Sequence, residues 1–275
     1  VLAQTGIGYG DLEIVIHGTT LATNALIERR GAKTAFVTTE GFRDVIEMRT
    51  ESRFDQYDLA IELPKPLVPR EDRFPVAGRI GAQGQELAPL DEAALAEIAE
   101  RIASGGYGAV AIGFIHSYLN PAHERRARAI IAARCDLPIS ISSDVSPQMR
   151  EFERFNTVCA NAYVRPQMAS YLERLQVRLK EKGATCPVFM IHSGGGLVSV
   201  ETAAEFPVRL VESGPAGGAI FAADVARRFG LERVVSYDMG GTTAKICLIE
   251  DFAPKTARSF EVARTTRFAK GSGMP

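Results

Sequence analysis

The chain has 275 residues, of which 46% are apolar and 24% are charged, and its formal net charge is −1. This composition predicts a globular protein with a sizeable buried core, organised as two domains or lobes. The near-neutral balance argues against a nucleic-acid partner or an anionic membrane surface, because both favour a basic excess. No apolar run approaches the ~20 residues that a membrane-spanning helix needs, so we expect no membrane partner.

The four cysteines, Cys135, Cys159, Cys186 and Cys247, lie far apart and form no CxxC pair. This spacing favours reduced thiols in a cytoplasmic protein over a disulfide framework or a zinc site. The chain starts at Val1 without a signal pattern, and its C-terminal stretch is polar and basic. We therefore expect it to be a piece of a longer protein.

Strands and helices alternate along most of the chain, which predicts an α/β protein. Asp91 is a favourable N-cap for the helix that follows it, and a pair of glycines at 105–106 ends that helix. Residues 50–90 carry most of the prolines, so we expect a loop-rich excursion with short strands there. The other elements expected in the first half are strands over 13–17, 35–39, 109–115 and 137–143, and helices over 22–30 and 121–134.

The second half begins with a helical pattern over 148–182. We expect this helix to break at Pro166, because a proline lacks the backbone N–H that a helix interior needs. A strand over 188–191 leads into Ser193-Gly-Gly-Gly196, and we expect a helix after that turn. The remaining expected elements are a helix from Ser213 to Gly230 and strands over 233–237 and 245–249.

The most informative stretch is the turn Asp238-Met-Gly-Gly-Thr-Thr243 between the last two strands. Its glycines would let the backbone N–H groups of Gly240, Gly241 and Thr242 point into one concavity, which forms an anion nest. The hydroxyls of Thr242 and Thr243 add further donors. Asp238, at the strand end, is placed to hold a hydrated Mg²⁺ or to orient an attacking water.

The alternative for this turn is an ordinary glycine-rich hairpin with a type I′ turn, and the short pattern alone does not decide between them. The helix before it favours the phosphate site. Its start, Glu212-Ser-Gly-Pro-Ala-Gly-Gly218, resembles the nucleotide-binding core of the actin, sugar-kinase and Hsp70 ATPases. Gly214, Gly217 and Gly218 are therefore candidate nucleotide contacts. A Walker A pattern is absent, and the glycines near the N-terminus follow no strand, so P-loop and Rossmann folds are disfavoured.

Six longer stretches occupy residues 17–31, 37–44, 116–125, 161–166, 193–197 and 238–245. In this order they resemble the hydantoinase A, 5-oxoprolinase and acetone carboxylase family over nearly the whole chain. The resemblance implies an incomplete actin-like (ribonuclease H-like) ATPase fold, an α/β fold with two lobes and mixed sheets flanked by helices. It divides the chain into an N-terminal hydantoinase/oxoprolinase region (1–147), a helical connection (148–185) and an ATP-binding region (186–275).

The same resemblance implies a hydrolase that uses ATP and Mg²⁺ to open a cyclic amide, such as hydantoin, N-methylhydantoin or 5-oxoproline, by phosphate activation of a carbonyl. It also implies a hydantoinase B-like partner subunit or domain, and an oligomer. Three alternatives remain open: an ATP-dependent ketone carboxylase subunit, an ATP-binding regulatory or chaperone-like module, and a non-catalytic structural subunit. Since the chain holds a single Asp-x-Gly-Gly-Thr turn, we expect the family's first phosphate hairpin to lie before Val1, and the piece alone to be inactive.

Two further groups of residues are candidates for the site. His17 ends a strand and titrates near neutrality in its ordinary state, so it is a candidate acid or base; the alternative is a turn-stabilising histidine bonded to a backbone carbonyl. Thr19, Thr20 and Asn24, which follow it, are candidate substrate contacts.

The amides of Ser193, Gly194 and Gly195 could bind a phosphate or a substrate carboxylate if the expected helix follows them; the alternative is a sharp turn with no ligand. Lys245 stands where the wider superfamily often has a second Asp. It could neutralise a phosphate, or point outward as a solvated strand residue.

Overall fold

The computed structural model describes residues 2–50, 53–239, 244–257, 260–264 and 271–274. The chain forms two compact units, each assembled from two separate stretches. Unit 1 consists of residues 1–24 and 168–259, and unit 2 of residues 25–167 and 260–275. The division of the chain into regions 1–147, 148–185 and 186–275 follows the family pattern rather than these units, and stays a prediction.

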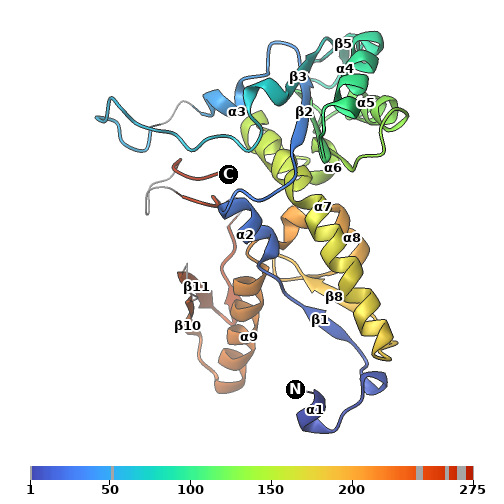
Figure 1. The fold of residues 1–275 in the computed structure, drawn as a ribbon. Helices are drawn as coiled ribbons and strands as arrows, with labels where there is room; N and C mark the ends of the chain where they lie inside the picture. Colours follow the sequence, from blue (N-terminus) through green and yellow to red (C-terminus); the bar gives the residue numbers. More distant parts are fainter. Residues whose placement is uncertain (1, 51–52, 240–243, 258–259, 265–270, 275) are drawn as a thin grey trace. The chain divides into compact units, whose positions relative to one another are not determined.

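Unit 2 is built on a parallel four-stranded sheet in the order β3-β2-β6-β7 (Figure 1). Every residue of the two central strands is buried, which is expected where helices cover both faces of a parallel sheet. The two pair in register from Thr34↔Ala109 to Thr38↔Gly113. The strands of this sheet are β2 (Thr34–Thr39), β3 (Arg73–Val76), β6 (Ala109–Gly113) and β7 (Ile139–Ile141).

The helices of unit 2 pack on this sheet through apolar faces. In α4 (Glu92–Ser104), Leu95, Ile98 and Ile102 are buried in the core cluster. The expected cap is confirmed, because the Asp91 carboxylate accepts a hydrogen bond from the N–H of Ala94 at 2.9 Å. The other elements of this unit are α3 (Val45–Met48), α5 (Ala122–Ala132), α6 (Ser142–Val145) and a two-stranded sheet of β4 (Arg79–Ile80) and β5 (Glu86–Ala88).

The expected break at Pro166 is wrong, because α7 runs without interruption from Glu151 to Glu181. Pro166 has no N–H for the carbonyl of Ala162, four residues before it. The side chains of Ala162, Val164 and Met168 on either side of the proline are fully buried. Packing of this part of the helix therefore outweighs the one lost hydrogen bond, and the helix continues. The boundary between the units falls within α7 and also within α2 (Leu21–Ile27).

Unit 1 contains two small sheets. In the first, β1 (Val15–His17) pairs in parallel with β8 (Val188–Ile191), which pairs antiparallel with β9 (Leu197–Ser199). In the second, the hairpin of β10 (Arg233–Met239) and β11 (Ala244–Glu250) is extended by β12 (Ala253–Pro254). Its helices are α1 (Leu2–Thr5), α8 (Val200–Glu205) and α9 (Ser213–Phe229).

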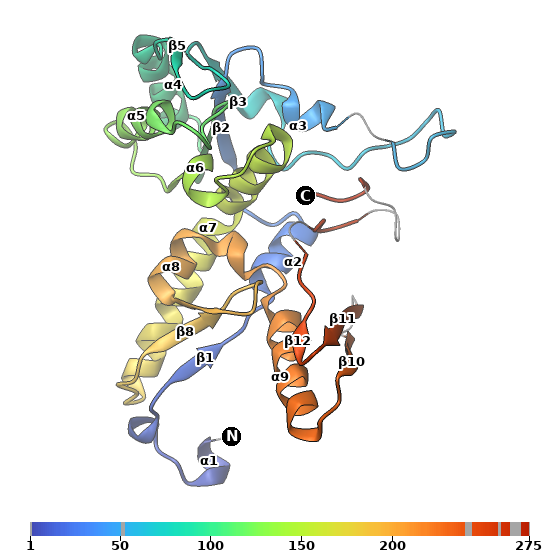
Figure 2. The same ribbon diagram turned by 180° about the vertical axis from the view of Figure 1, so that it is seen from behind.

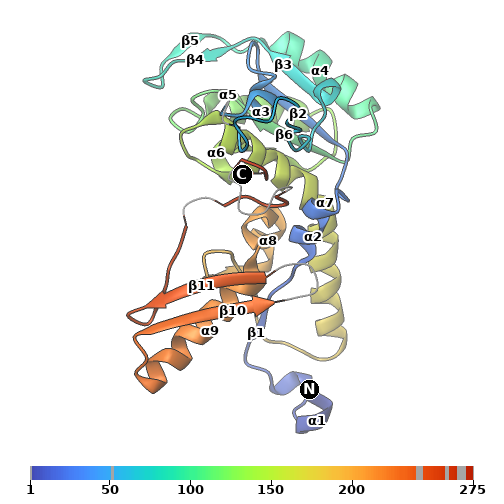
Figure 3. The same ribbon diagram turned by 90° about the vertical axis from the view of Figure 1, so that its left-hand side faces the viewer.

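The hairpin β10–β11 lies beside α9, as Figures 2 and 3 show. Since register partners share a face, Asp238, Lys245 and the buried Ile249 lie on one side of the hairpin. The opposite side is apolar and exposed: the side chains of Val235, Tyr237, Met239, Ile246 and Leu248 are each between 52% and 69% exposed. Unit 1 therefore has one sheet face against α9 and one open face.

Candidate functional site

The N-terminus of α9 is set by an unusual backbone conformation at Glu212. Its φ of 65° lies in the left-handed region, which is uncommon for a residue with a side chain. Two hydrogen bonds hold this turn against the segment that enters α2. The N–H of Glu212 donates to Oγ1 of Thr23 at 3.1 Å, and the hydroxyl of Ser213 donates to the carbonyl oxygen of Thr19 at 3.3 Å. The start of the glycine-rich helix is thus fixed to the chain that follows His17.

The three glycines in the first turns of α9 have different surroundings. A Cβ added at Gly217 would lie 3.0 Å from Cδ1 of Ile191 in β8, so close packing accounts for this glycine. A Cβ added at Gly214 or Gly218 would meet no described atom within 4 Å. Packing within the described residues does not require glycine at either of these two positions. Both leave the backbone of the first helical turns accessible, as an anion-binding helix N-terminus requires.

The phosphate turn itself, Gly240, Gly241, Thr242 and Thr243, lies outside the described residues. The strands on either side of it are described, and Asp238 is the register partner of Lys245. Asp238 is exposed near the end of β10, and its part in binding a ligand stays a prediction.

Lys245 forms an ion pair that the sequence alone did not indicate, and its part in neutralising a phosphate stays a prediction. Its ammonium lies 2.8 Å from Oε2 of Glu212, with the lysine side chain 36% exposed and the glutamate side chain 19% exposed. This ion pair joins the strand that follows the phosphate turn to the residue that precedes α9. It therefore brings the start of β11 next to the residue that precedes α9 within unit 1.

His17, at the end of β1, is half-buried and its Nε2 lies 2.6 Å from the hydroxyl of Tyr171 on α7. Its ring therefore contacts a side chain rather than the backbone carbonyl considered above. Burial lowers the pKa of His17 from the ordinary histidine value, because the charged imidazolium loses hydration there. The neutral ring is the favoured form near pH 7, as a proton acceptor requires.

The other candidates after His17 contribute mainly to local structure. The hydroxyl of Thr19 accepts from the N–H of Leu21 at 3.2 Å, at the start of α2. The side-chain amide of Asn24 donates to the hydroxyl of Thr20 at 3.5 Å, within the first turn of the same helix. Their part in binding a substrate stays a prediction.

The Ser193–Gly196 segment does not lead into a helix, so that expectation is wrong. It is the hairpin turn between β8 and β9, and three of its amides are already bonded. The N–H of Ser193 donates to the carbonyl oxygen of Arg209 at 2.8 Å, and that of Gly194 to Nδ1 of His192 at 2.7 Å. The N–H of Gly195 donates to the carbonyl oxygen of His192 at 2.7 Å. These amides already donate hydrogen bonds within the protein, and no helix begins at this turn. The reason to expect an anion at a helix N-terminus therefore does not apply here.

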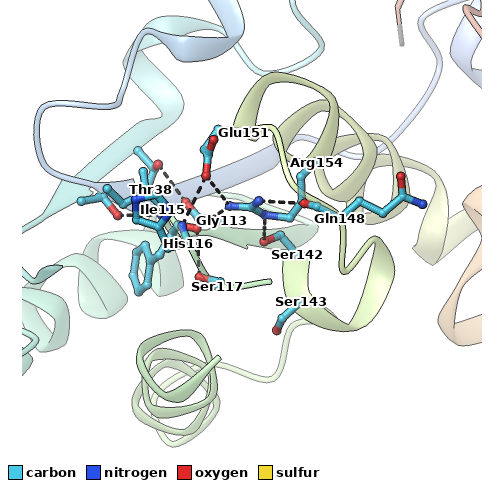
Figure 4. A network of polar contacts seen from close by, with 12 residues as sticks. Thr38, Gly113, Ile115, His116, Ser117, Ser142, Ser143, Gln148, Glu151 and Arg154 are labelled. Atoms are coloured by element: carbon cyan, nitrogen blue, oxygen red, sulfur yellow. Dashed lines mark hydrogen bonds and ion pairs between the residues drawn. The ribbon is translucent and has the colours of Figure 1, made fainter. Parts of the chain in front are cut away.

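A second polar cluster lies in unit 2, where β6 and β7 end (Figure 4). The carboxylate of Glu124 is fully buried and accepts hydrogen bonds from the N–H groups of Phe114 and Ser143 and from the hydroxyl of Ser142. Arg154, also fully buried, donates to the same hydroxyl and to the carbonyl oxygen of Phe114. Burial raises the pKa of Glu124, and these hydrogen bonds oppose the rise. The cluster satisfies the ends of buried strands, and we assign it a structural role.

The site offers few ligands for a metal ion. Among the described residues, no three His, Cys, Asp or Glu side chains lie close enough together to hold one. Mg²⁺ in phosphate-transfer sites commonly uses one or two carboxylates together with waters and phosphate oxygens, and the exposed Asp238 fits that pattern. The structure also brings in Glu212, Thr23 and Tyr171, which sequence reasoning did not single out. Glu212 directly precedes the glycine-rich helix in the sequence. Its bond to Lys245 joins residues far apart in the chain, so no local sequence pattern indicates it.

Comparisons with known proteins show the family and the fold to which the chain is similar. The family model described as the hydantoinase/oxoprolinase N-terminal region matches residues 1–135, and the model described as hydantoinase/oxoprolinase matches residues 154–270. An uncharacterised protein of Methanocaldococcus jannaschii is 40% identical over 98% of this chain, which covers 41% of that protein.

Two solved structures are similar to the chain. The crystal structure of the ATP-dependent caprolactamase of Pseudomonas jessenii matches with a TM-score of 0.80 and 39% identity, covering 87% of this chain and 35% of that one. A nucleotide-free structure of acetone carboxylase matches with a TM-score of 0.80 and 26% identity, covering 91% and 38%. The chain therefore spans less than half the length of these relatives.

The fold class is the mixed α/β, actin-like ATPase class that the sequence predicts, with sheets flanked by helices in both units. Within it, the chain belongs to the hydantoinase/oxoprolinase family, as its two consecutive regions match the family's models. In the part of the chain that the structure describes, no helix is long and apolar enough to span a membrane.

Proposed function

We propose that this chain is the nucleotide-binding part of an ATP-dependent enzyme that opens a cyclic amide. The observation that carries the proposal is the Lys245–Glu212 ion pair, which draws the strand after the phosphate turn to the start of α9. An anion nest and a helix N-terminus side by side make a site for a polyphosphate. The similarity to a caprolactamase supports the substrate class, since caprolactam is a cyclic amide.

The chemistry follows from the electronic structure of an amide. Its carbonyl carbon is a poor electrophile because the nitrogen lone pair delocalises onto the oxygen. Transfer of the γ-phosphoryl group from ATP to that oxygen releases ADP and leaves a carbon that water can attack. The ring C–N bond then breaks as the nitrogen takes up a proton. A second water hydrolyses the resulting acyl phosphate to the carboxylate and inorganic phosphate. The main task of the protein is then to hold the phosphates and to stabilise the charge on the group in transfer.

Each candidate residue has a stated part in this proposal. The backbone of Gly240 to Thr243 and the amide of Gly214 bind the phosphates, and Gly218 leaves space for the nucleotide beside α9. Lys245 supplies a positive charge beside the turn. Mg²⁺, bound through water at Asp238, would neutralise charge on the phosphate oxygens. His17 is proposed to accept a proton through its neutral ring, with Tyr171 orienting it.

A second subunit or domain is part of the proposal, together with assembly into an oligomer. Several relatives bear subunit names, among them the caprolactamase subunit alpha of Pseudomonas jessenii. A partner that supplies the step after phosphorylation is consistent with the small number of acid–base groups found at the site in this chain.

The test is an ATPase assay on the full-length protein with its partner subunit. We expect ADP release to rise when a cyclic amide such as caprolactam, hydantoin or 5-oxoproline is added. Absence of stimulation by every cyclic amide would contradict the proposal. The control is a linear amide of equal size, which should have no effect because it lacks the ring that is opened.

A ketone carboxylase is the second candidate, favoured by the likeness to acetone carboxylase. At the same phosphate site, a ketone that has lost an α-proton to a base would take the γ-phosphoryl group of ATP on its enolate oxygen, with release of ADP. The α-carbon would then attack carbon dioxide, and water would release the phosphate and restore the ketone. Stimulation of ATP cleavage by acetone in the presence of bicarbonate, with no response to cyclic amides, would select this alternative.

A further inference from the structure

One ammonium group near the phosphate turn has two carboxylates within its reach. Lys245 on β11 is the register partner of Asp238 on β10, and directly opposed side chains in an antiparallel pair are about 5 Å apart at Cβ. In the structure the ammonium nevertheless bonds Glu212 at 2.8 Å. Between these described residues, no ion pair joins Lys245 to Asp238. The lysine is therefore held by the carboxylate of another element.

The position of Glu212 is strongly determined by its surroundings. Its left-handed backbone, at φ 65°, is anchored by the bond from its own N–H to Thr23 and by the bond from Ser213 to Thr19. A backbone outlier that persists must be held by its surroundings, and such residues concentrate at functional sites. The glutamate side chain is 19% exposed, so its carboxylate is also the less hydrated of the two partners in the ion pair.

We infer that Glu212 is a positioning residue that holds the Lys245 ammonium away from Asp238. The inference rests on the proposed function. With Lys245 tied to Glu212, the exposed carboxylate of Asp238 is free for the cation that accompanies the triphosphate, and the ammonium stays beside the turn. Without the Glu212 carboxylate, Lys245 pairs across the strands with Asp238 and neutralises the group that the cation needs.

The experiment uses the full-length protein and measures binding of a non-hydrolysable ATP analogue by calorimetry while the Mg²⁺ concentration is varied. Glu212→Gln removes the charge but keeps the size of the side chain. We expect it to raise the Mg²⁺ concentration needed for half-maximal binding by about 10- to 100-fold, the usual effect of losing a residue that orients a metal-binding group. Glu212→Asp, which keeps a carboxylate, should recover part of this loss.

The decisive variant is the double substitution Glu212→Gln with Lys245→Met. Removing the lysine frees Asp238 again, so the Mg²⁺ requirement should return toward that of the unaltered protein. A glutamate that only stabilised the fold would not give this rescue. Thermal melting of each variant checks that the fold is kept. If Glu212→Gln proves unfolded, Lys245→Met alone still tests the inference, because it should weaken analogue binding without lowering the Mg²⁺ requirement.

Three results would overturn the inference: an unchanged Mg²⁺ requirement in Glu212→Gln, a raised requirement that the double variant does not reverse, or a lowered requirement in Lys245→Met. In each of these cases the unaltered protein still binds the analogue with Mg²⁺, so the proposed function stands. If the unaltered protein does not bind the analogue at all, the proposed function fails, and the inference fails with it.

Discussion

The two central sheets of the molecule differ in how much of their surface is covered. In unit 2, every residue of β2 and β6 is buried between layers of helices. In unit 1, the hairpin β10–β11 meets α9 on one face and leaves an apolar face open. The uncharged strands β2 and β6 thus form the core of one unit, whereas the charged strands β10 and β11 carry the candidate phosphate site in the other.

The polar groups show the same difference. At the ends of β6 and β7, Glu124 and Arg154 are fully buried and have several partners each within unit 2. At the end of β10, Asp238 is exposed, and Gly214 and Gly218 have open space beside them. Internally satisfied groups stabilise a fold, whereas accessible carboxylates and backbone amides can bind a ligand. From this comparison we expect unit 2 to contribute most of the stability, and we propose the ligand site in unit 1.

The largest expected effect is on stability. Ile112 is fully buried in β6. The substitution Ile112→Ala should lower the free energy of unfolding of unit 2 by about 2–5 kcal/mol, because it leaves a cavity in the core. Hydrogen exchange of the amides of β2 and β6, measured at increasing urea concentration, would give this change in stability. The matched control is Val235→Ala on the open face of β10, which should change stability by no more than about 0.5 kcal/mol. Equal effects of the two substitutions would remove the contrast between the units.

The next effect separates packing from binding within α9. Alanine at Gly214 meets no described atom within 4 Å, so it should leave the fold intact or stabilise it by about 0.5–1 kcal/mol, as alanine favours a helix. It should nevertheless weaken ATP binding, because the added methyl group lies where phosphate would approach.

Gly217→Ala is the matched comparison, since its Cβ would lie 3.0 Å from Ile191 and should lower stability instead. Thermal melting and ATP titration of both variants give the two readouts. If Gly214→Ala binds ATP as well as the unaltered protein, the start of α9 is not part of the phosphate site.

The smallest expected effect is the pH dependence that His17 gives to unit 1. Burial lowers its pKa in the folded state, so below the ordinary histidine value of 6.5 the unfolded chain takes up the proton first. The stability associated with His17 is therefore complete above that pH and is lost as the pH falls below it. His17→Gln should reduce this acid loss in urea unfolding between pH 8 and pH 5. An identical acid loss in the variant would show that the His17 ring is not held neutral in the fold.

Much of the fold could be predicted from local patterns. The cap at Asp91, the buried strand β6, and the helix from Ser213 to Gly230 all follow from capping and apolar periodicity, and the structure confirms them. Two predictions failed because packing and strand pairing with distant segments outweigh the local pattern. Buried side chains around Pro166 keep α7 continuous, and the Ser193–Gly196 turn pairs β8 with β9 instead of starting a helix.

The site was predictable only in its continuous part. The turn from Asp238 to Thr243 and the glycines at the start of α9 each form a short continuous pattern, which a single sequence displays. The bonds of Lys245 to Glu212 and of His17 to Tyr171 join residues far apart in the chain, and no spacing rule reports such pairs. Long-range contacts of this kind are decided by how the elements pack, which a single sequence does not display.

The central claim is that the hairpin β10–β11 carries the ATP site, and Asp238→Asn tests it most directly. In the full-length protein with its partner, this variant should cleave Mg²⁺·ATP slower by on the order of 100-fold or more, with unchanged thermal stability. The control is Asp224→Asn on α9, a carboxylate paired with Arg228 at the surface, which should keep the full rate. If Asp238→Asn also keeps the full rate, the phosphate site lies elsewhere and the account is contradicted.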